Sequence, residues 1–375
     1  MRGCLTRGTV RGVSLSLRLH VWGVLPVTLA LGSVGIPAVG SAATVARPGA
    51  QTAVREYGGT IVFSAFDQAE SRWYLSVRRA GAKRAQRLDV ASSEAPFDAD
   101  IGTDSGGRPQ LIYQRCALAP PTGTALVGAR VGCDLFVYSL AGTTGERAVR
   151  NANDATRNDV HGTIWRGRIA WTRQYGSGKA ANPVVYTKTL TAPRSQPSRR
   201  LPGVPARVRG NVEPIVSPTT NRNVQALELW GNNLAVIVNY TCAQCSGFGH
   251  SEVRLDKVSE GTSGRVASLV SGLSGQGLVG LSFFDGRLAW YRGCGDCLTS
   301  YVGPWRYRLS TGSYGRGTPG PMSPSGFADT GTHLYETVGC APPPSQSMPQ
   351  DNANCRIDKI TPPTFAVAPA PIPSY

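Results

Sequence analysis

The chain has 375 residues, of which 39 are Lys or Arg and 23 are Asp or Glu, so its formal net charge is +16. Almost all of the positive charge comes from arginine, because the chain has only five lysines. This excess favours anionic partners such as acidic glycans or wall polymers, although an ordinary solvated surface can also carry it. The sequence contains no nucleic-acid-binding motif, so we expect no nucleic-acid partner.

The N-terminal segment has the features of a secretory signal. Residues 1–43 contain four arginines and no acidic residue, and they include the apolar run "VWGVLPVTLALGSVGIPAVGSAA". A basic start, an apolar middle and small residues at the end predict a signal peptide, with cleavage near Ala42 or Ala43. Prolines and glycines within the run disfavour the alternative, a permanent membrane helix. We therefore expect a secreted or envelope-associated protein that does not span a membrane after cleavage.

Six copies of one unit follow along the chain. Each copy has a Gly or polar turn and then an apolar run that ends in an aromatic or polar residue. The six runs are "GGTIVFSAF", "GRPQLIYQRC", "RGRIAWTRQ", "GNNLAVIVNYTC", "DGRLAWYRGC" and "GTHLYETVGC". They align on Ile61, Leu111, Ile169, Leu234, Leu288 and Leu334, which are 46 to 65 residues apart. A period of this length indicates a repeat architecture.

Each run is followed, after a variable loop, by a second strand-like segment. These segments are "WYLSVRR", "DLFVYSL", "PVVYTKTL", "SEVRLDKV", "PWRYRLS" and "CRIDKIT". Aromatic and β-branched residues in near alternation predict strands paired in hairpins. A third segment, apolar on both faces, precedes most of the first runs and is clearest in "HGTIW", "ALELW" and "LVGLSFF".

Several short strands in each of six units predict an all-β fold, a six-bladed β-propeller, because radial repetition leaves few exposed sheet edges. A large sandwich or two smaller β domains would not explain six similar hairpins. We assign residues 44–365 to a single propeller domain and residues 366–375 to a Pro-rich tail. The Pro- and Arg-rich segment 191–224 is expected to combine an outer strand with a surface loop. The strand that closes the ring is left open, with "TAVREYG" (52–58) and "TFAVA" (364–368) as candidates.

The pattern resembles the TolB-type propeller repeats of secreted bacterial proteins. The stretches "DGRLAWYR" (285–292) and "DLFVYSLAGTTGE" (134–146) carry this resemblance most clearly, and it extends over roughly residues 53 to 365. The usual Ser/Pro-Asp-Gly turn of those repeats remains here only as Asp285-Gly286. The resemblance implies a propeller fold and, because propellers serve many functions, no particular activity.

Eight cysteines of the predicted mature chain fall in equivalent hairpin loops. An even number of cysteines in an exported chain favours disulfides, and the two ends of a hairpin loop are close enough to be bridged. The expected pairs are Cys116–Cys133, Cys242–Cys245, Cys294–Cys297 and Cys340–Cys355. Two alternatives are a four-thiolate zinc site built from the two CxxC pairs and a redox-active dithiol, which would need a helix N-terminus that the sequence does not predict.

The segments that lead into the innermost strands should lie on the same face as the cysteine loops. They would place carboxylates and one histidine around the mouth of the central channel, where loops on a rigid scaffold commonly bind ligands. The predicted ligand-binding residues are Asp98, Asp100, Asp159, His161 and Asp329. Turn-forming aspartates and a structural histidine are the simpler explanation of the same residues.

His161 is the histidine of most interest, because Asp159 beside it could orient it as a general base or metal ligand. His250 and His333 are expected to be structural, as are the strand tryptophans. A cation bound by the channel-mouth carboxylates stays an open alternative. No phosphate-binding loop or known hydrolase motif occurs, and we expect no cofactor.

These features favour a secreted, monomeric, non-enzymatic propeller that binds an anionic envelope glycan or an envelope protein. The alternative is a polysaccharide lyase or hydrolase that uses His161 and the channel-mouth carboxylates, with Asp159 as the partner of His161.

Overall fold

The computed structural model describes the chain in several stretches, and all statements below concern those residues. They are 42–116, 132–142, 145–149, 152–154, 156–175, 182–193, 195–202, 204, 221–241, 249–271, 277–293, 302–316, 326–340 and 352–361. The chain divides into two compact units, Met1–Ala38, which is outside these ranges, and Val39–Tyr375. Among the described residues there is no helix that could cross a membrane.

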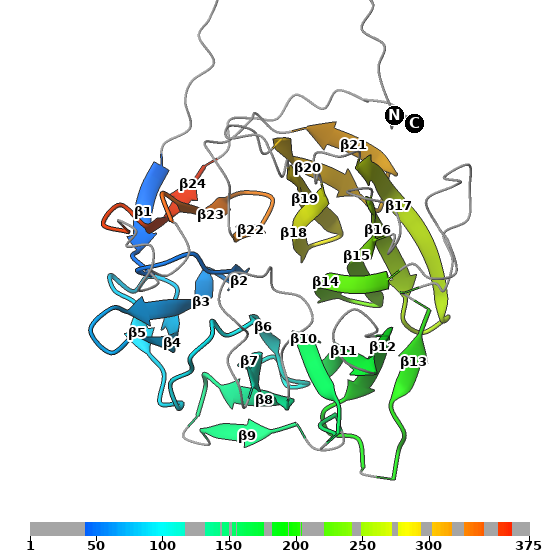
Figure 1. Ribbon diagram of the computed structural model, residues 1–375, viewed down its shortest axis with the longest axis horizontal. Helices are drawn as coiled ribbons and strands as arrows, with labels where there is room; N and C mark the ends of the chain where they lie inside the picture. The colour runs from blue at the N-terminus through cyan, green and yellow to red at the C-terminus, as the bar shows by residue number, and fades with distance from the viewer. Residues whose placement is uncertain are drawn as a thin grey trace, which may run out of the picture. The chain divides into compact units, whose positions relative to one another are not determined.

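The second unit is a six-bladed β-propeller, as the sequence predicts, and it consists of six four-stranded antiparallel sheets. In five blades the strands follow one another in sequence from the centre outward (Figure 1). Blade one comprises β2 (Val54–Tyr57), β3 (Thr60–Asp67), β4 (Arg72–Arg78) and β5 (Gln86–Arg87). Blade two comprises β6 (Ala99–Thr103), β7 (Pro109–Cys116), β8 (Cys133–Ser139) and β9 (Glu146–Ala148). Blade three comprises β10 (Asn158–Trp165), β11 (Arg168–Tyr175), β12 (Asn182–Thr189) and β13 (Arg199–Leu201).

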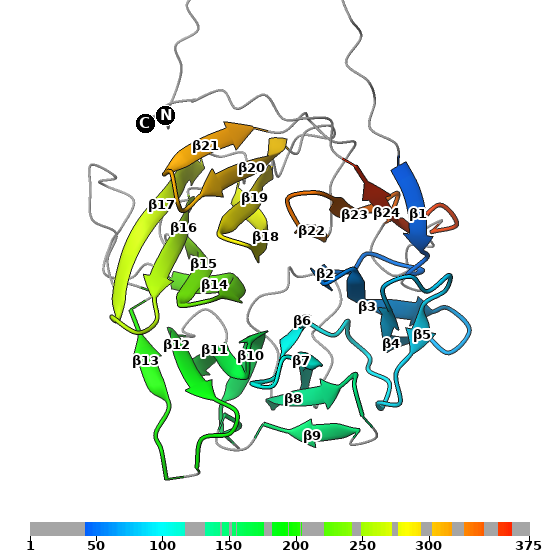
Figure 2. The same cartoon turned by 180° about the vertical axis from the view of Figure 1, so that it is seen from behind.

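The remaining three blades repeat this arrangement, and Figure 2 shows the same ring from behind. Blade four comprises β14 (Asn221–Trp230), β15 (Asn233–Thr241), β16 (Gly249–Lys257) and β17 (Thr262–Ser271). Blade five comprises β18 (Gly277–Phe284), β19 (Arg287–Gly293), β20 (Val302–Arg308) and β21 (Ser313–Arg316). Blade six comprises β22 (Phe327–Asp329), β23 (Leu334–Val338) and β24 (Arg356–Ile360), with β1 (Ala42–Ala46) as its outer strand.

The ring is closed by β1, which pairs antiparallel with β24 from Ala42 opposite Ile360 to Ala46 opposite Ile357. Of the two closing strands considered from the sequence, the first does not have this role. "TAVREYG" instead supplies β2, the innermost strand of blade one, and "TFAVA" is outside the described residues. The closing strand was missed because "AATVA" is short, consists mostly of small residues, shows no alternation of apolar and polar residues, and overlaps the end of the predicted signal.

Each blade buries both of its faces, which explains the unbroken apolar run within a middle strand, such as "LIY" in β7. Along β7, Leu111 and Tyr113 pack against blade one, whereas Ile112 packs against blade three. Successive side chains of a strand point to opposite faces, so one run of residues supplies two interfaces. In the described part of the chain, the core is divided into clusters that each lie between neighbouring blades.

The innermost strands approach each other closely at the centre. Gly102 of β6 has no room for a side chain, since a Cβ atom there would lie 2.2 Å from the Ile164 carbonyl oxygen of β10. The glycine therefore permits the backbone of blade two to contact that of blade three.

Two of the four predicted disulfides are present. Cys116 at the end of β7 is bonded to Cys133 at the start of β8, and their Cα atoms are 3.9 Å apart. Cys340 and Cys355 bridge the equivalent connection in blade six. Disulfides of this kind are typical of an oxidising compartment outside the cytoplasm. Cys242, Cys245, Cys294 and Cys297 lie outside the described residues, as do nearly all of the predicted signal and the tail.

We expect the Cys116–Cys133 bridge to stabilise the propeller. It closes a segment with a sequence separation of 17, for which chain entropy gives about 3 kcal/mol. The double variant Cys116→Ser/Cys133→Ser should therefore lose about this amount of its free energy of unfolding and unfold at a lower denaturant concentration. The Cys340→Ser/Cys355→Ser pair, with a separation of 15, is the matched comparison and should lose a similar amount. Equal unfolding curves for wild type and both variants would contradict the expectation.

Candidate active site

The centre of the propeller is lined by equivalent positions of the six innermost strands. Glu56, Ile101, Ile164, Leu229, Phe283 and Asp329 pair with the six aligned residues of the repeats. The residue before each of these defines a ring, which we call the channel ring. Its members are Arg55, Asp100, Thr163, Glu228, Ser282 and Ala328. All but Thr163 line a small cavity that is partly open to solvent.

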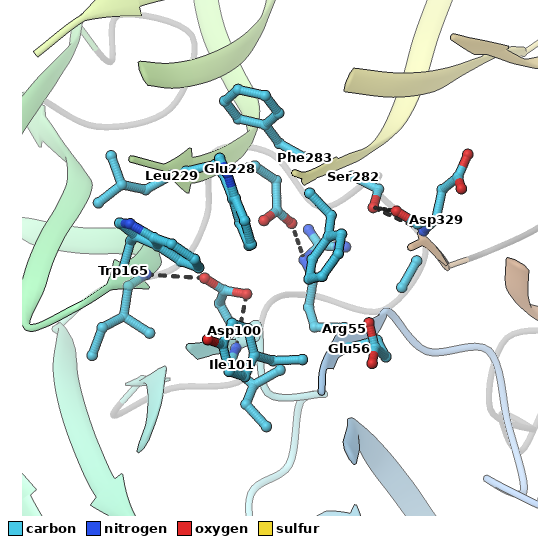
Figure 3. A pocket seen from close by; sticks show the side chains of 15 residues that line it. Arg55, Glu56, Asp100, Ile101, Trp165, Glu228, Leu229, Ser282, Phe283 and Asp329 are labelled. Carbon is cyan, nitrogen blue, oxygen red and sulfur yellow. Dashed lines mark hydrogen bonds and ion pairs between the residues drawn. The ribbon is translucent and has the colours of Figure 1, made fainter. Parts of the chain in front are cut away.

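An ion pair crosses this ring. The Nε atom of Arg55 in blade one lies 2.5 Å from Oε1 of Glu228 in blade four, and the two side chains point toward each other in Figure 3. Blades one and four are opposite each other in a ring of six, so the pair spans the centre. The side chains of Arg55 and Glu228 are 12% and 8% exposed, so both are reachable only from within the cavity.

Asp100 of blade two is held by a chain of hydrogen bonds through the next two blades. Its carboxylate accepts from the Thr163 hydroxyl at 2.7 Å and from the Ile164 N–H at 3.0 Å. The Thr163 hydroxyl accepts in turn from the Leu229 N–H of blade four at 2.9 Å. Asp100 also accepts from the N–H of Ile101 (Figure 3). The network fixes three innermost strands in one register.

The guanidinium of Arg55 lowers the pKa values of more than one carboxyl group. Burial raises the pKa of Glu228 well above its ordinary value; Arg55 opposes this shift, and the charges of Asp100 and Asp98 add to it. Burial likewise raises the pKa of Asp100, against the lowering by Arg55 and the Thr163 hydroxyl. Because like charges so close cannot all ionise, the cluster retains a proton to higher pH than isolated carboxylates do.

A histidine–aspartate pair precedes the ring residues in sequence: His161 is in β10, and Asp98 comes directly before β6. Nδ1 of His161 is 2.6 Å from Oδ2 of Asp98, and the side chains are 15% and 27% exposed. The backbone N–H of His161 also donates to the side-chain oxygen of Gln114, at 3.0 Å. Gln114 is two residues before Cys116, so the disulfide-bonded end of β7 positions His161. The structure thus brings together Asp98 and His161, two of the residues that the sequence analysis named.

A bulge in β10 explains which way His161 points. The register shifts between Val160 and Thr163, and His161 has a φ of 53°. An extra residue of this kind redirects side chains and often occurs beside active sites. β14 and β18 have register shifts at the equivalent level, between Val224 and Ala226 and between Val279 and Leu281.

Asp159 has a different role from the one predicted. Its fully buried carboxylate accepts from Trp171 Nε1 at 2.9 Å, from Arg173 Nε at 2.8 Å and from the Asp154 N–H at 3.0 Å. These bonds direct it into blade three, while the bulge turns His161 toward blade two. The predicted pairing of Asp159 with His161 is therefore corrected, and Asp98 is the partner.

The other predicted residues are spread over the structure. Asp329 lines the cavity but is bound by Arg306 and by the Gly331 N–H. His250 is buried in β16 against Glu252, and His333 precedes β23. Among the described residues, no group of three or more His, Cys, Asp or Glu could hold a metal ion.

Aromatic side chains cluster at the ends of four innermost strands, beyond the channel ring. They are the last residues of their strands, Tyr57, Trp165, Trp230 and Phe284. The ring centroids of Trp165 and Trp230 are 3.7 Å apart, and those of Trp230 and Phe284 are 4.5 Å apart. Tyr57 and Trp230 come from opposite blades, yet their rings are only 6.5 Å apart. We call this cluster the aromatic plug, and its four rings line the same cavity as the channel ring.

The sequence analysis did not identify Arg55, Glu228 or Gln114. The repeats did contain a signal for Arg55 and Glu228. When the six innermost strands are aligned, the channel-ring position is occupied by Arg, Asp, Thr, Glu, Ser and Ala, which is far more polar than the neighbouring core positions.

No family model matches the chain, and no curated protein matches it. Solved structures do. An oligogalacturonate lyase in complex with manganese is 10% identical, with 87% of this chain and 94% of that chain covered and a TM-score of 0.44. A Penicillium chrysogenum α-L-arabinanase with arabinobiose is 9% identical, with 88% and 100% covered and a TM-score of 0.46.

A chain from a study of two prolyl endopeptidases is 14% identical, with 80% of this chain covered and a TM-score of 0.36; this chain spans only 44% of its length. At such identities the similarity shows the fold alone.

The expectation of a non-enzymatic binding module is wrong. It rested on the absence of a catalytic constellation, whereas the structure pairs His161 with Asp98 and holds a buried Arg55–Glu228 ion pair across the channel ring.

The aromatic plug should contribute to stability. Trp230→Ala removes a ring that contacts neighbours from three other blades, and we expect a loss of about 3 kcal/mol in the free energy of unfolding. Trp230→Phe keeps an aromatic ring and should recover most of this loss. Denaturant unfolding of the two variants beside wild type measures both effects. A Trp230→Ala protein as stable as Trp230→Phe would contradict the role of the plug.

Proposed function

We propose that the protein cleaves an acidic polysaccharide by β-elimination at the mouth of its channel. The observation that carries the proposal is the 2.6 Å contact between His161 Nδ1 and Asp98 at a partly exposed site. A carboxylate on Nδ1 orients the ring and leaves Nε2 to take a proton, as a general base requires. Asp98 acts through His161 and is a positioning residue.

Elimination needs three groups, and we assign one residue to each of them. His161 Nε2 takes the proton from the carbon next to the uronate carboxylate, and this electron pair forms a carbon–carbon double bond. The bond from the adjacent carbon to the glycosidic oxygen breaks, and that oxygen takes a proton from Glu228. Arg55 neutralises the uronate carboxylate, which makes the first proton easier to remove. The raised pKa of Glu228 suits a group that must donate.

The substrate class follows from charge. Arg55 provides a cation inside the cavity, and the formal net charge of +16 favours an anionic polymer.

We infer that the protein works outside the cytoplasm, which the predicted signal and the two disulfides support. The TolB-type resemblance stays a prediction, and the protein is proposed to act as a monomer.

His161→Ala should lower the rate of cleavage by about 10² to 10⁴-fold, the usual contribution of a general base. Asp98→Asn should lower it less, because the imidazole is still present but no longer held by a charge. His333→Ala, a histidine-to-alanine change outside the channel, is the matched control and should keep wild-type activity.

The assay follows the ultraviolet absorbance of unsaturated uronate ends and, in parallel, the number of reducing ends, with a panel of acidic polysaccharides. Elimination produces both signals. Reducing ends without the absorbance would show hydrolysis and overturn the proposed reaction. Equal activity of His161→Ala and wild type would overturn the proposed base, and intact polymers throughout the panel would overturn the function.

The rate should fall as pH rises through the raised pKa of Glu228, because the group donates only when protonated. The same sign applies to stability: a carboxyl whose pKa is raised by folding stabilises the fold at pH values below its unfolded pKa, and this contribution is lost as pH rises through the folded value. Glu228→Gln should thus be slow at all pH values and lack this alkaline decline. The pH profile of kcat/KM, which reports the groups of the free protein, measures the effect, and identical profile shapes would contradict it.

A further inference from the structure

Arg55 is the only cationic side chain that lines the cavity among the described residues. Its guanidinium is surrounded by Glu228 from β14, by Asp100 from β6 and, at longer range, by Asp98 before β6. Any anionic ligand that enters the cavity must therefore compete with the protein's own carboxylates for this cation.

The carboxylates around Arg55 are held to different extents. Asp100 accepts hydrogen bonds from the Thr163 hydroxyl and from two backbone N–H groups, so it is fixed independently of Arg55. In the described part of the chain, Arg55 is the partner recorded for the Glu228 carboxylate. Glu228 also lies on the opposite blade, so breaking its contact disturbs no strand pairing. Glu228 is the carboxylate that can be exchanged.

We propose that the carboxylate of a bound uronate replaces Glu228 at Arg55, and that Glu228 takes one proton from solvent as it leaves. No bond other than O–H forms or breaks, and the charge at the guanidinium is unchanged because one carboxylate replaces another. The inference rests on the proposed function for the identity of the ligand, and it adds that the anionic group of the substrate itself places the proton on the acid.

The surroundings of Glu228 favour this exchange. When Arg55 turns to the ligand, Glu228 loses the one neighbour that holds its pKa down, while burial, Asp100 and Asp98 continue to raise it. Two other carboxylates line the cavity: Glu56 of β2 accepts from the Gly59 N–H, and Asp329 is paired with Arg306. Ser282 and Ala328 bring no charge. An ionised Glu228 would then be a buried charge without a partner, which is costly.

The exchange links substrate recognition to catalysis. A neutral sugar cannot replace Glu228, so at alkaline pH the acid stays ionised on Arg55 and cannot donate. A uronate displaces it and converts it to the form that can protonate a leaving oxygen. Selectivity for acidic polymers would therefore be expressed in the chemical step as well as in binding.

The test measures the affinity of glucuronate for the intact protein by calorimetry over a range of pH, with glucose as the neutral probe. For wild type, affinity should be constant at low pH and fall about tenfold per pH unit once Glu228 is ionised in the free protein. Glu228→Gln should bind glucuronate with an affinity that does not fall in this way as the pH rises. Titrations in two buffers of different ionisation enthalpy should show that proton uptake approaches one for wild type at alkaline pH.

Two controls make the outcome specific. Glu260→Gln is the same change at a half-exposed position of the same blade, and it should behave as wild type. Arg55→Lys should weaken glucuronate binding and leave glucose unaffected, because an ammonium cannot form the paired contact of a guanidinium. The unfolding curve of each variant shows that it is folded.

Equal pH dependence in wild type and Glu228→Gln, or no glucuronate binding at all, would overturn the exchange. Cleavage of acidic polymers without proton uptake would leave the proposed function standing and the exchange wrong. Proton uptake without cleavage of any polymer would support the exchange and show that the proposed function is wrong.

Discussion

The burial of both faces of every blade is the constraint on which the rest of the structure depends. Leu111 and Ile112 are adjacent in β7 yet pack against different blades, so neither face of the sheet is available for a polar site. What remains is the inner edge of each sheet and the loops that lead to it. Six such edges converge on one axis, and a single polar residue on each is enough to assemble a charged cavity.

The Arg55–Glu228 pair has a physical cost that a structural role does not explain. A buried ion pair rarely stabilises a protein more than well-packed apolar residues would, because both charges lose their hydration. Four of the six strands already contribute aromatic rings to the plug at the next pleat, so an apolar ring position would close the channel equally well. Charge at Arg55 and Glu228 is better explained by a ligand than by the fold.

Local features of the fold were predictable, and contacts between distant segments were not. The repeated runs identified the middle strands, and Cys116 and Cys133 were paired correctly because they end adjacent strands of one hairpin. Asp98 and His161 were both placed at the channel mouth, but their contact was missed. Its geometry depends on a bulge with positive φ at a non-glycine residue, which no sequence pattern indicated. Arg55 was overlooked for another reason: it lies in a segment considered only as a closing strand.

The rigidity of the mouth follows from how its histidine is attached. The His161 backbone is bonded to Gln114, which is two residues from the Cys116–Cys133 bridge, and the Cys133 N–H donates to the Asn158 side chain at the start of β10. The disulfide therefore fixes both the strand that carries His161 and the residue that orients its backbone. Asp98, which holds His161, also acts through its charge on Arg55. The proposed base and the proposed carboxylate-binding cation therefore share one electrostatic site, and this suits a reaction that removes a proton from the carbon next to a carboxylate.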